Sequence, residues 1–199
     1  LLAQFFTSLA YSAPCTSPTY VSVSGAMSTI ISDCSSFVWS SGNVDSNSKT
    51  ITGDGTAYTV SAPTTGSITL GTFTNTGNIN GRTSGSFTVG IALDPDSTNA
   101  AVNVTKINNS GTIVGRYGIY IGAHTTLAEL FNSGTIGLKL GDVNALWIYG
   151  GTVTKINNSG TIKSADTALL NQGTIRTLNN TGTIDGINYG ISNAGTITT

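Results

Sequence analysis

The ten-residue phrase VTKINNSGTI occurs at positions 104–113 and again, letter for letter, at 153–162. The phrase contains no catalytic side chain, and its repetition indicates a structural unit rather than an active site. Strands that recur in one chain, joined by similar turns, are typical of units that stack on one another, and such a turn is called a corner below. The repeat therefore constrains the fold before it says anything about chemistry.

A longer pattern, apolar-x-x-apolar-x-Asn-x-Gly-x-Ile, runs through the second half of the chain. Its second apolar positions are Ile107, Leu130, Ile156 and Leu178, which are 23, 26 and 22 residues apart. The 49-residue distance between the two copies of the phrase is thus two periods. A looser copy begins at Leu70, and the last two units each hold a second NxGTI phrase, at 171–175 and 193–197. One period therefore has two corners of similar chemistry.

Asparagine and glycine have physical reasons to recur at a corner. Glycine accepts a positive φ without a Cβ clash, and asparagine tolerates left-handed geometry while it bonds its own backbone. Coils of parallel strands lie about 4.8 Å apart, so stacked corners should form a ladder of side-chain amides with isoleucines stacked inside. The residues expected in this corner ladder are Asn109, Asn132, Asn158 and Asn180, with Gly111, Gly134, Gly160 and Gly182.

The segments between corners are short, β-prone and alternating, and no run of helical spacing is long enough for a helix of several turns. With about 22–26 residues per coil, they predict an all-β, single-stranded parallel β-solenoid in which each coil buries its hydrophobic face against its neighbours. A β-sandwich is the alternative, because it also has short strands and frequent turns. A sandwich does not need Asn, Gly and Ile to return in fixed order at this period.

The beginning of the chain differs from the repeats. Residues 1–13, LLAQFFTSLAYSA, are typical of the remnant of a secretory signal peptide, and the alternative is a short apolar element that covers one end of the fold. Residues 14–67 are expected to form an N-terminal cap and the first irregular coils. Cys15 and Cys34 predict a disulfide within this cap, worth about 3 kcal/mol if unstrained. Residues 68–199 are the solenoid repeats, which stop in mid-phrase and predict a continuing solenoid.

Charge is scarce in this chain. Only 9% of the residues are charged, and eight basic and nine acidic residues give a net charge of -1. The surface is therefore made of hydroxyl and amide groups, and the scattered basic residues form no stripe for a phosphate backbone. Nucleic acid is not an expected partner.

The phrases INNSGTI and LNNTGTI resemble those of the passenger domains of bacterial autotransporters, the type V secretion proteins. The resemblance covers roughly residues 68–199, and a signal-like start with a cysteine-containing cap also fits it. It implies a right-handed β-helix that is exported and displayed on the cell surface or released. It also implies an outer-membrane β-barrel translocator, in the same chain or, as in two-partner secretion, in a separate one.

A search for catalytic or metal-binding groups assigns none, and no cofactor is expected. Polysaccharide-cleaving β-helix enzymes gather acidic residues on adjacent coils, whereas the aspartates here do not align along the coils. Asp94 and Asp96 flank Pro95 in a turn with too few ligands for a dedicated calcium site. His124, near Glu129, is interpreted as a loop residue. The unaligned aspartates are Asp142, Asp166 and Asp185.

Two interruptions of the repeat are the expected places for binding. The spacing grows to 34 residues between Phe73 and Ile107, and the coil that begins at Leu130 is also longer than its neighbours. Insertions in solenoids become loops on one face. In the second interruption, Trp147 and Tyr149 are candidate ligand contacts that would stack on a sugar ring. The alternative is that both fill a wider stretch of core.

The expected function is that of a non-enzymatic surface or secreted solenoid, an adhesin or the stalk that presents one. Its partners would be glycans or proteins of a host or neighbouring cell, including further copies of itself. One alternative is a polysaccharide-cleaving enzyme of the pectate-lyase type. The other is an ice-binding solenoid, for which the single threonine at each corner predicts one column rather than a plane. These threonines are Thr112, Thr135, Thr161 and Thr183.

Overall fold

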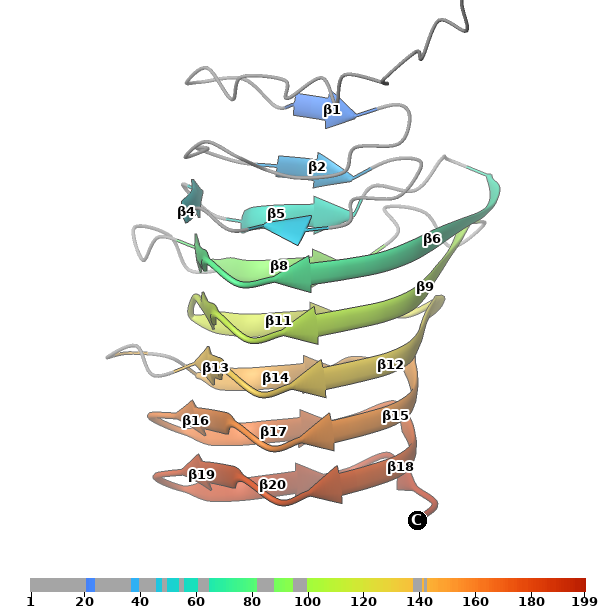
Figure 1. Cartoon of the computed structure of the whole chain (residues 1–199). Coiled ribbons are helices and arrows are strands. Elements are labelled where there is room, and N and C mark those ends of the chain that lie inside the picture. The colour runs from blue at the N-terminus through green and yellow to red at the C-terminus, as the bar shows by residue number, and fades with distance from the viewer. Residues whose placement is uncertain are drawn as a thin grey trace, which may run out of the picture.

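A computed structural model of the chain confirms the predicted β-solenoid, with its coils stacked in successive layers (Figure 1). The described residues contain strands and turns, and none of their elements is a helix long and apolar enough to cross a membrane. The structure describes residues 21–23, 37–39, 46–47, 50–53, 56–60, 65–81, 88–94, 100–137, 141 and 143–199.

The strands described form three parallel sheets. Sheet 1 contains β3 (Ser46–Asn47), β6 (Gly66–Asn75), β9 (Ala100–Asn109), β12 (Thr125–Asn132), β15 (Thr152–Asn158), β18 (Thr174–Asn180) and β21 (Thr196–Ile197). Sheet 2 contains β4 (Thr50–Gly53), β7 (Asn78–Gly81), β10 (Thr112–Val114), β13 (Thr135–Gly137), β16 (Thr161–Ser164) and β19 (Thr183–Gly186). Sheet 3 contains β1 (Val21–Val23), β2 (Phe37–Trp39), β5 (Thr56–Val60), β8 (Val89–Leu93), β11 (Tyr117–Ile121), β14 (Asn144–Ile148), β17 (Thr167–Asn171) and β20 (Tyr189–Asn193).

A coil uses one strand from each sheet in turn. The chain runs, for example, through β9, β10 and β11 before β12 begins the next coil in sheet 1. β12 pairs in parallel with β9 on one side and with β15 on the other. Each inner strand is therefore covered on both sides by the coils next to it, which is how neighbouring repeats of a solenoid stabilise one another.

The register of sheet 1 confirms the period read from the sequence. Paired asparagines at the end of its strands are separated by 34, 23, 26 and 22 residues, from Asn75 through to Asn180. The variable part of each coil lies outside the paired strands, because the strands keep their alignment while the separations change. Insertions therefore leave the stack of coils intact.

Apolar side chains point into the solenoid and form columns. In sheet 2, Ile79, Ile113, Ile136 and Ile162 are paired from coil to coil, and each is fully buried. Sheets 1 and 3 contribute similar columns, and one continuous cluster of buried residues joins them. Burial of an isoleucine or leucine side chain stabilises a fold by about 1.5–3 kcal/mol, so these columns are the main source of cohesion between coils.

The first part of the chain contributes strands to the same three sheets. β1 and β2 pair in parallel at one end of sheet 3, and β2 pairs with β5. Residues 1–13, Cys15 and Cys34 lie outside the described residues. The expected signal-peptide remnant and the disulfide therefore stay predictions.

Candidate functional site

The corner asparagines form a continuous column of hydrogen bonds along the solenoid. Asn109 Nδ2 donates to Asn132 Oδ1 at 2.8 Å, and Asn132 Nδ2 donates to Asn158 Oδ1 at 2.7 Å. The same geometry links Asn75 to Asn109 and Asn158 to Asn180. The first four members are buried, and Asn180 is exposed. A buried amide is favourable only when its partners are present, so this column is a structural element of the fold.

Each amide in this column also holds its own corner. Asn132 Nδ2 reaches the carbonyl oxygen of Gly134 at 3.3 Å and that of Thr161, in the next coil, at 3.3 Å. The backbone N–H of Gly134 donates to the carbonyl oxygen of Asn109, one coil earlier, at 3.1 Å. Side-chain and backbone groups of the corner are therefore bonded both within a coil and between coils.

The corner glycines are needed for a different reason from the one expected. Positive φ angles occur elsewhere among the described residues, and the only non-glycine one is at His124. A Cβ built on Gly134 would overlap the carbonyl oxygen of Gly111, and Gly160 and Gly182 have the same relation to the coil before them. Close stacking of the corners, rather than a left-handed backbone, excludes a side chain there. The described glycines with positive φ are Gly66, Gly137, Gly141 and Gly150.

A second asparagine column begins at the other corner of the last coils. Asn171 Nδ2 donates to Asn193 Oδ1 at 2.6 Å and to the carbonyl oxygen of Thr196 at 3.1 Å. In the coil before, the position paired with Asn171 is Ile148, which is fully buried. This corner therefore changes from apolar packing to amide bonding along the stack.

The best candidate for a binding surface is an aromatic cluster on the outer face of sheet 3. It consists of Tyr117 and Tyr120 on β11, Trp147 on β14 and Tyr149 just after β14. The Trp147 ring lies 5.0 Å from that of Tyr117, 5.1 Å from that of Tyr120 and 5.5 Å from that of Tyr149, measured between centroids. Its indole Nε1 donates to Gln172 Oε1 at 2.9 Å. Four rings and an amide thus lie together across adjacent coils.

Packing within the cluster exposes its members unequally. Tyr120 retains 8% of its surface, whereas Tyr149 retains 50%. The two tyrosine rings are stacked at 6.3 Å. Burial, followed by the negative charge of Asp94 and the effect of Tyr149, raises the pKa of Tyr120 to about 12. Tyr120 therefore remains a neutral phenol at physiological pH, and its ring lies beside that of Tyr149.

Trp147 and Tyr149 do not fill a wider stretch of the solenoid core. Their neighbours on β14, Leu146 and Ile148, are the residues that belong to the main core. Trp147 packs instead against a separate small cluster that includes Val89, Ala92 and Tyr120. Side chains alternate between the two faces of a strand, so the residue between two core positions faces outward. The interpretation as core filling is therefore wrong.

The sequence alone did not single out Tyr117 and Tyr120. They become part of the cluster because Tyr120 is paired with Trp147 in the parallel register of β11 and β14. Tyr120 and Trp147 are 27 residues apart, which is the length of one long coil. Their pairing can therefore be predicted only when the length of that coil is known. The alternation of apolar and aromatic residues in Ile119–Tyr120–Ile121 is the signal from which an outward-facing Tyr120 was predictable.

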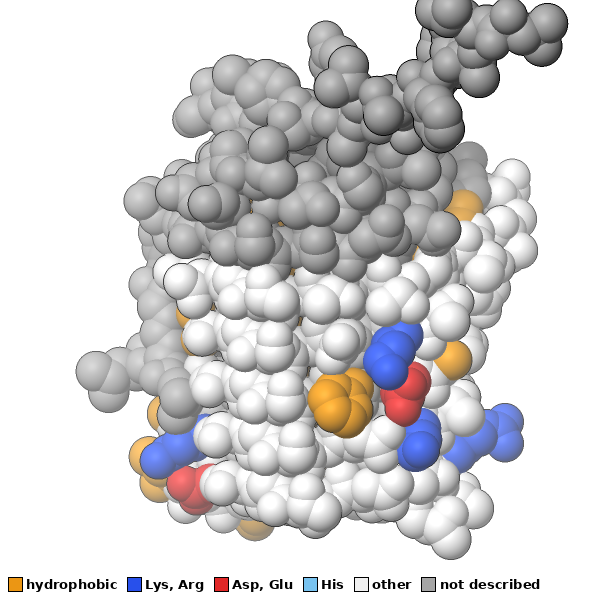
Figure 2. All heavy atoms as spheres, in the orientation of Figure 1, with side chains coloured by type: hydrophobic (Ala, Val, Ile, Leu, Met, Phe, Trp, Pro, Cys, Tyr) orange, Lys and Arg blue, Asp and Glu red, His pale blue; other side chains and the backbone are white. Residues whose placement is uncertain are grey.

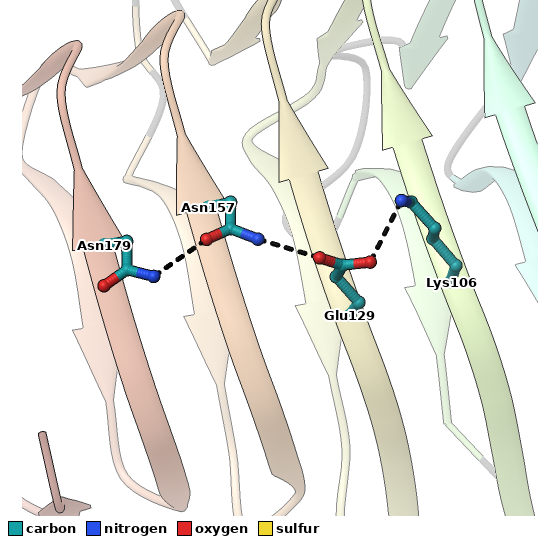
Figure 3. A network of polar contacts seen from close by, with 4 residues as sticks. All are labelled: Lys106, Glu129, Asn157 and Asn179. Carbon is teal, nitrogen blue, oxygen red and sulfur yellow. Dashed lines mark hydrogen bonds and ion pairs between the residues drawn. The ribbon is translucent and has the colours of Figure 1, made fainter.

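The outer face of sheet 1 carries a polar network (Figure 3). Lys106 Nζ lies 2.9 Å from Glu129 Oε2, and Asn157 Nδ2 donates to Glu129 Oε1 at 2.8 Å. Asn179 Nδ2 donates in turn to Asn157 Oδ1 at 3.0 Å. Lys155 is paired with Glu129 in register on the other side from Lys106. Lys106 and Lys155 are thus two coils apart with a carboxylate between them.

The carboxyl group of Glu129 should make the stability of the folded chain depend on pH. The hydrogen bond and charge of Lys106, with smaller effects from Lys155 and Asn157, lower the pKa of Glu129 below its ordinary 4.5. Its contribution to stability is present above that pH and is lost as pH falls through the lowered pKa. We expect Glu129→Gln to remove this component, so that the free energies of unfolding of variant and wild type converge below about pH 4.5. Denaturant unfolding at several pH values measures this, and a constant difference would contradict it.

The other polar residues considered from the sequence lie apart. Asp166 accepts a hydrogen bond from Asn188 Nδ2 at 2.7 Å, and Asp185 pairs with Lys163 at 3.3 Å. His124 is an exposed turn residue. Asp96 and Asp142 are outside the described part of the chain, within which no group of three or more His, Cys, Asp or Glu is placed to hold a metal. The four corner threonines do align in one column.

Comparisons of the chain with protein-family models, curated proteins and solved structures find no match. The class of protein defined by the fold is a parallel β-solenoid, with an aromatic cluster on one outer face and a charged network on another. Its function is therefore inferred from these two faces.

Proposed function

We propose that this chain is an exported β-solenoid passenger of the autotransporter type that acts as an adhesin through glycan binding. The observation that carries the proposal is the aromatic cluster on the outer face of sheet 3. Tyr149 is half exposed, and its ring is backed by Tyr120 and Trp147. A rigid aromatic ring with an apolar face and a polar hydroxyl suits the face of a sugar ring, which is also apolar with polar edges.

The strands beneath the cluster supply the rigidity that weak binding needs. Tyr120 and Trp147 are paired in register between β11 and β14, and the indole of Trp147 is held by Gln172. Side chains held in place by strands and by one another lose little freedom when a ligand binds, which favours affinity. The described strands of sheet 3 carry no charged residue, and the carboxylate of Asp94, which follows β8 and acts on Tyr120, disfavours an acidic ligand, so this face suits an uncharged saccharide.

An adhesin on the cell surface gains from many weak contacts. The chain is poor in charge, with 9% charged residues, and its exposed groups are chiefly hydroxyls and amides. Copies displayed side by side on one cell would bind a glycan-covered surface with an effective affinity above that of one copy. This favours attachment to host or neighbouring cells as the function, with an outer-membrane translocator as the route to the surface.

Tyr149→Ala tests the proposed site. We expect the variant to bind neutral oligosaccharides about tenfold more weakly, because an exposed aromatic ring at a binding surface commonly contributes more than 1 kcal/mol. Isothermal titration of the whole chain against a panel of neutral oligosaccharides measures the change. Tyr189→Ala is the matched control, since Tyr189 is also an exposed tyrosine of sheet 3 and lies on β20, away from the cluster.

Display of the chain on a non-adherent bacterium tests adhesion itself. Attachment to glycan-coated surfaces, reduced by Tyr149→Ala and unaffected by Tyr189→Ala, is the expected result. Cells that neither attach nor aggregate would contradict the proposal. Equal loss with both variants would exclude the aromatic cluster as the contact surface.

A further inference from the structure

The three sheets divide the charged residues unequally. The strands of sheet 3, as far as they are described, carry none, and those of sheet 2 carry Lys163 and Asp185, which pair with each other. Sheet 1 carries three cations and one carboxylate: Lys106, Lys155, Arg176 and Glu129. Figure 2 shows charged side chains of this face gathered beside an apolar one, at some distance from a second group of blue and red side chains at the lower left. We call these residues of sheet 1, together with Phe131, the basic patch.

One of the three cations in the basic patch forms an ion pair, and the charge of Lys155 acts on the same carboxylate, with which Lys155 is paired in register. Glu129 forms its ion pair with Lys106, at 2.9 Å. Lys155 and Arg176 are exposed, and neither has an ion-pair partner within the described residues. They lie on the adjacent strands β15 and β18, where Lys155 is paired with Thr177, the residue that follows Arg176. Two exposed cations on neighbouring coils, without an ion pair in the described part of the chain, favour a ligand that carries negative charge.

Uncharged groups suited to a sugar lie on the same sheet as these cations. The Phe131 ring lies beside Lys106, whose Nζ is 5.4 Å from its centroid, and Phe131 is paired in register with Asn157. Asn179 follows in the next coil and donates to Asn157. The patch therefore presents one partly exposed ring, a row of amides and two exposed cations along the stack.

We propose that the basic patch binds an acidic polysaccharide, a chain of pyranose rings that carry carboxylates. Arg176 and Lys155 bind the carboxylates, and the planar guanidinium of Arg176 suits bidentate contact with one. Phe131 packs on the face of a sugar ring, and Asn157 and Asn179 bind its hydroxyls. The strand network of Lys106, Glu129 and Asn157 holds these groups in position.

The charge of the patch separates this ligand from other polyanions. Duplex DNA carries one negative charge for about every 1.7 Å of its length and is bound through many Lys and Arg contacts. The described strands of sheet 1 offer three cations, of which one is already paired with Glu129. A sparsely charged chain that also offers hydroxyls matches this surface better. The proposal is independent of the aromatic cluster, which lies on sheet 3.

Polygalacturonate is the probe for a test with the whole chain. We expect wild type to bind it with an affinity that falls as salt is raised, and Lys155→Gln with Arg176→Gln to weaken binding about tenfold. Both side chains are exposed and unpaired, so the folded state should persist, which the far-ultraviolet circular dichroism spectrum checks. Lys163→Gln removes one positive charge from sheet 2 and is the matched control for the single variants Lys155→Gln and Arg176→Gln.

The proposal would be overturned by the absence of binding to polygalacturonate, by binding that is independent of salt, or by equal weakening with Lys163→Gln and Arg176→Gln. Tighter binding to duplex DNA than to polygalacturonate would assign the patch to nucleic acid instead and overturn it as well. Tyr149→Ala should leave polygalacturonate binding unchanged, so a loss there would place the acidic ligand on the aromatic cluster and contradict the basic patch.

Discussion

Asn132→Asp should destabilise the folded chain by about 3–5 kcal/mol at neutral pH. The substitution keeps the shape of a fully buried side chain and replaces its Nδ2 donor with a carboxylate oxygen. That oxygen would face three acceptors that Nδ2 now satisfies: Asn158 Oδ1 and the carbonyl oxygens of Gly134 and Thr161. A buried charge among acceptors is strongly unfavourable. Denaturant unfolding measures the change.

The free energy of unfolding of this variant, measured as a function of pH, distinguishes the loss of the hydrogen bonds donated by Asn132 Nδ2 from a loss of packing. Protonation of the introduced carboxyl group restores a donor, so the destabilisation should shrink as pH falls. The matched control is Asn180→Asp, in the same column. Asn180 is exposed, and its Nδ2 donates to the carbonyl oxygen of Gly182 at 3.1 Å. A similar loss of stability in both variants would mean that the cost of the substitution does not depend on burial of the asparagine.

Gly134→Ala is the substitution with the second largest expected effect, about 3 kcal/mol or more. A Cβ at this position would overlap the carbonyl oxygen of Gly111 and lie 2.6 Å from the carbonyl carbon of Ser110. Both are backbone atoms of the coil before, so relief requires two coils to separate at the corner. The hydrogen bond from Thr135 N–H to Gly111, at 2.9 Å, would be strained by the same movement.

Thermal or denaturant unfolding of Gly134→Ala measures this effect, with Gly190→Ala as the control. A Cβ on Gly190 would first meet the carbonyl oxygen of Ile184, at 3.1 Å, which asks for a much smaller adjustment. Amide hydrogen exchange adds a local measurement, because loss of protection should concentrate in the coils on both sides of Gly134. Equal destabilisation by the two substitutions would contradict the close stacking of the corners.

The corner phrase contained enough information to predict the coil. Asn109, Asn132 and Asn158 recur with Ile113, Ile136 and Ile162 at a nearly constant distance, and stacked parallel strands place each set in a column. The reason proposed for the glycines was wrong, because composition does not tell a glycine with positive φ from one that has no room for a Cβ. At Gly134 the obstacle is a backbone atom of another coil, which only the stack defines.

The two outer surfaces were harder to predict. Trp147 and Tyr149 stood out as large aromatic residues in a long coil, but Tyr120 joins them through the register of β11 and β14. In the same way, Glu129 was noticed beside His124 in the sequence, whereas the structure pairs its carboxylate with Lys106. Which residues meet between coils depends on how many residues each coil has in its loops, outside the paired strands.

The sequence by itself determined the repeating unit: a coil of 22 to 26 residues, an Asn–Gly corner and an apolar column inside it. Only the tertiary structure decided which side chains meet across coils and which face each of them occupies. The physical reason is that a local pattern sets whether a residue points inward or outward, while its neighbour one coil away is set by the register. Insertions of unequal length change the sequence distance to that neighbour without changing the register.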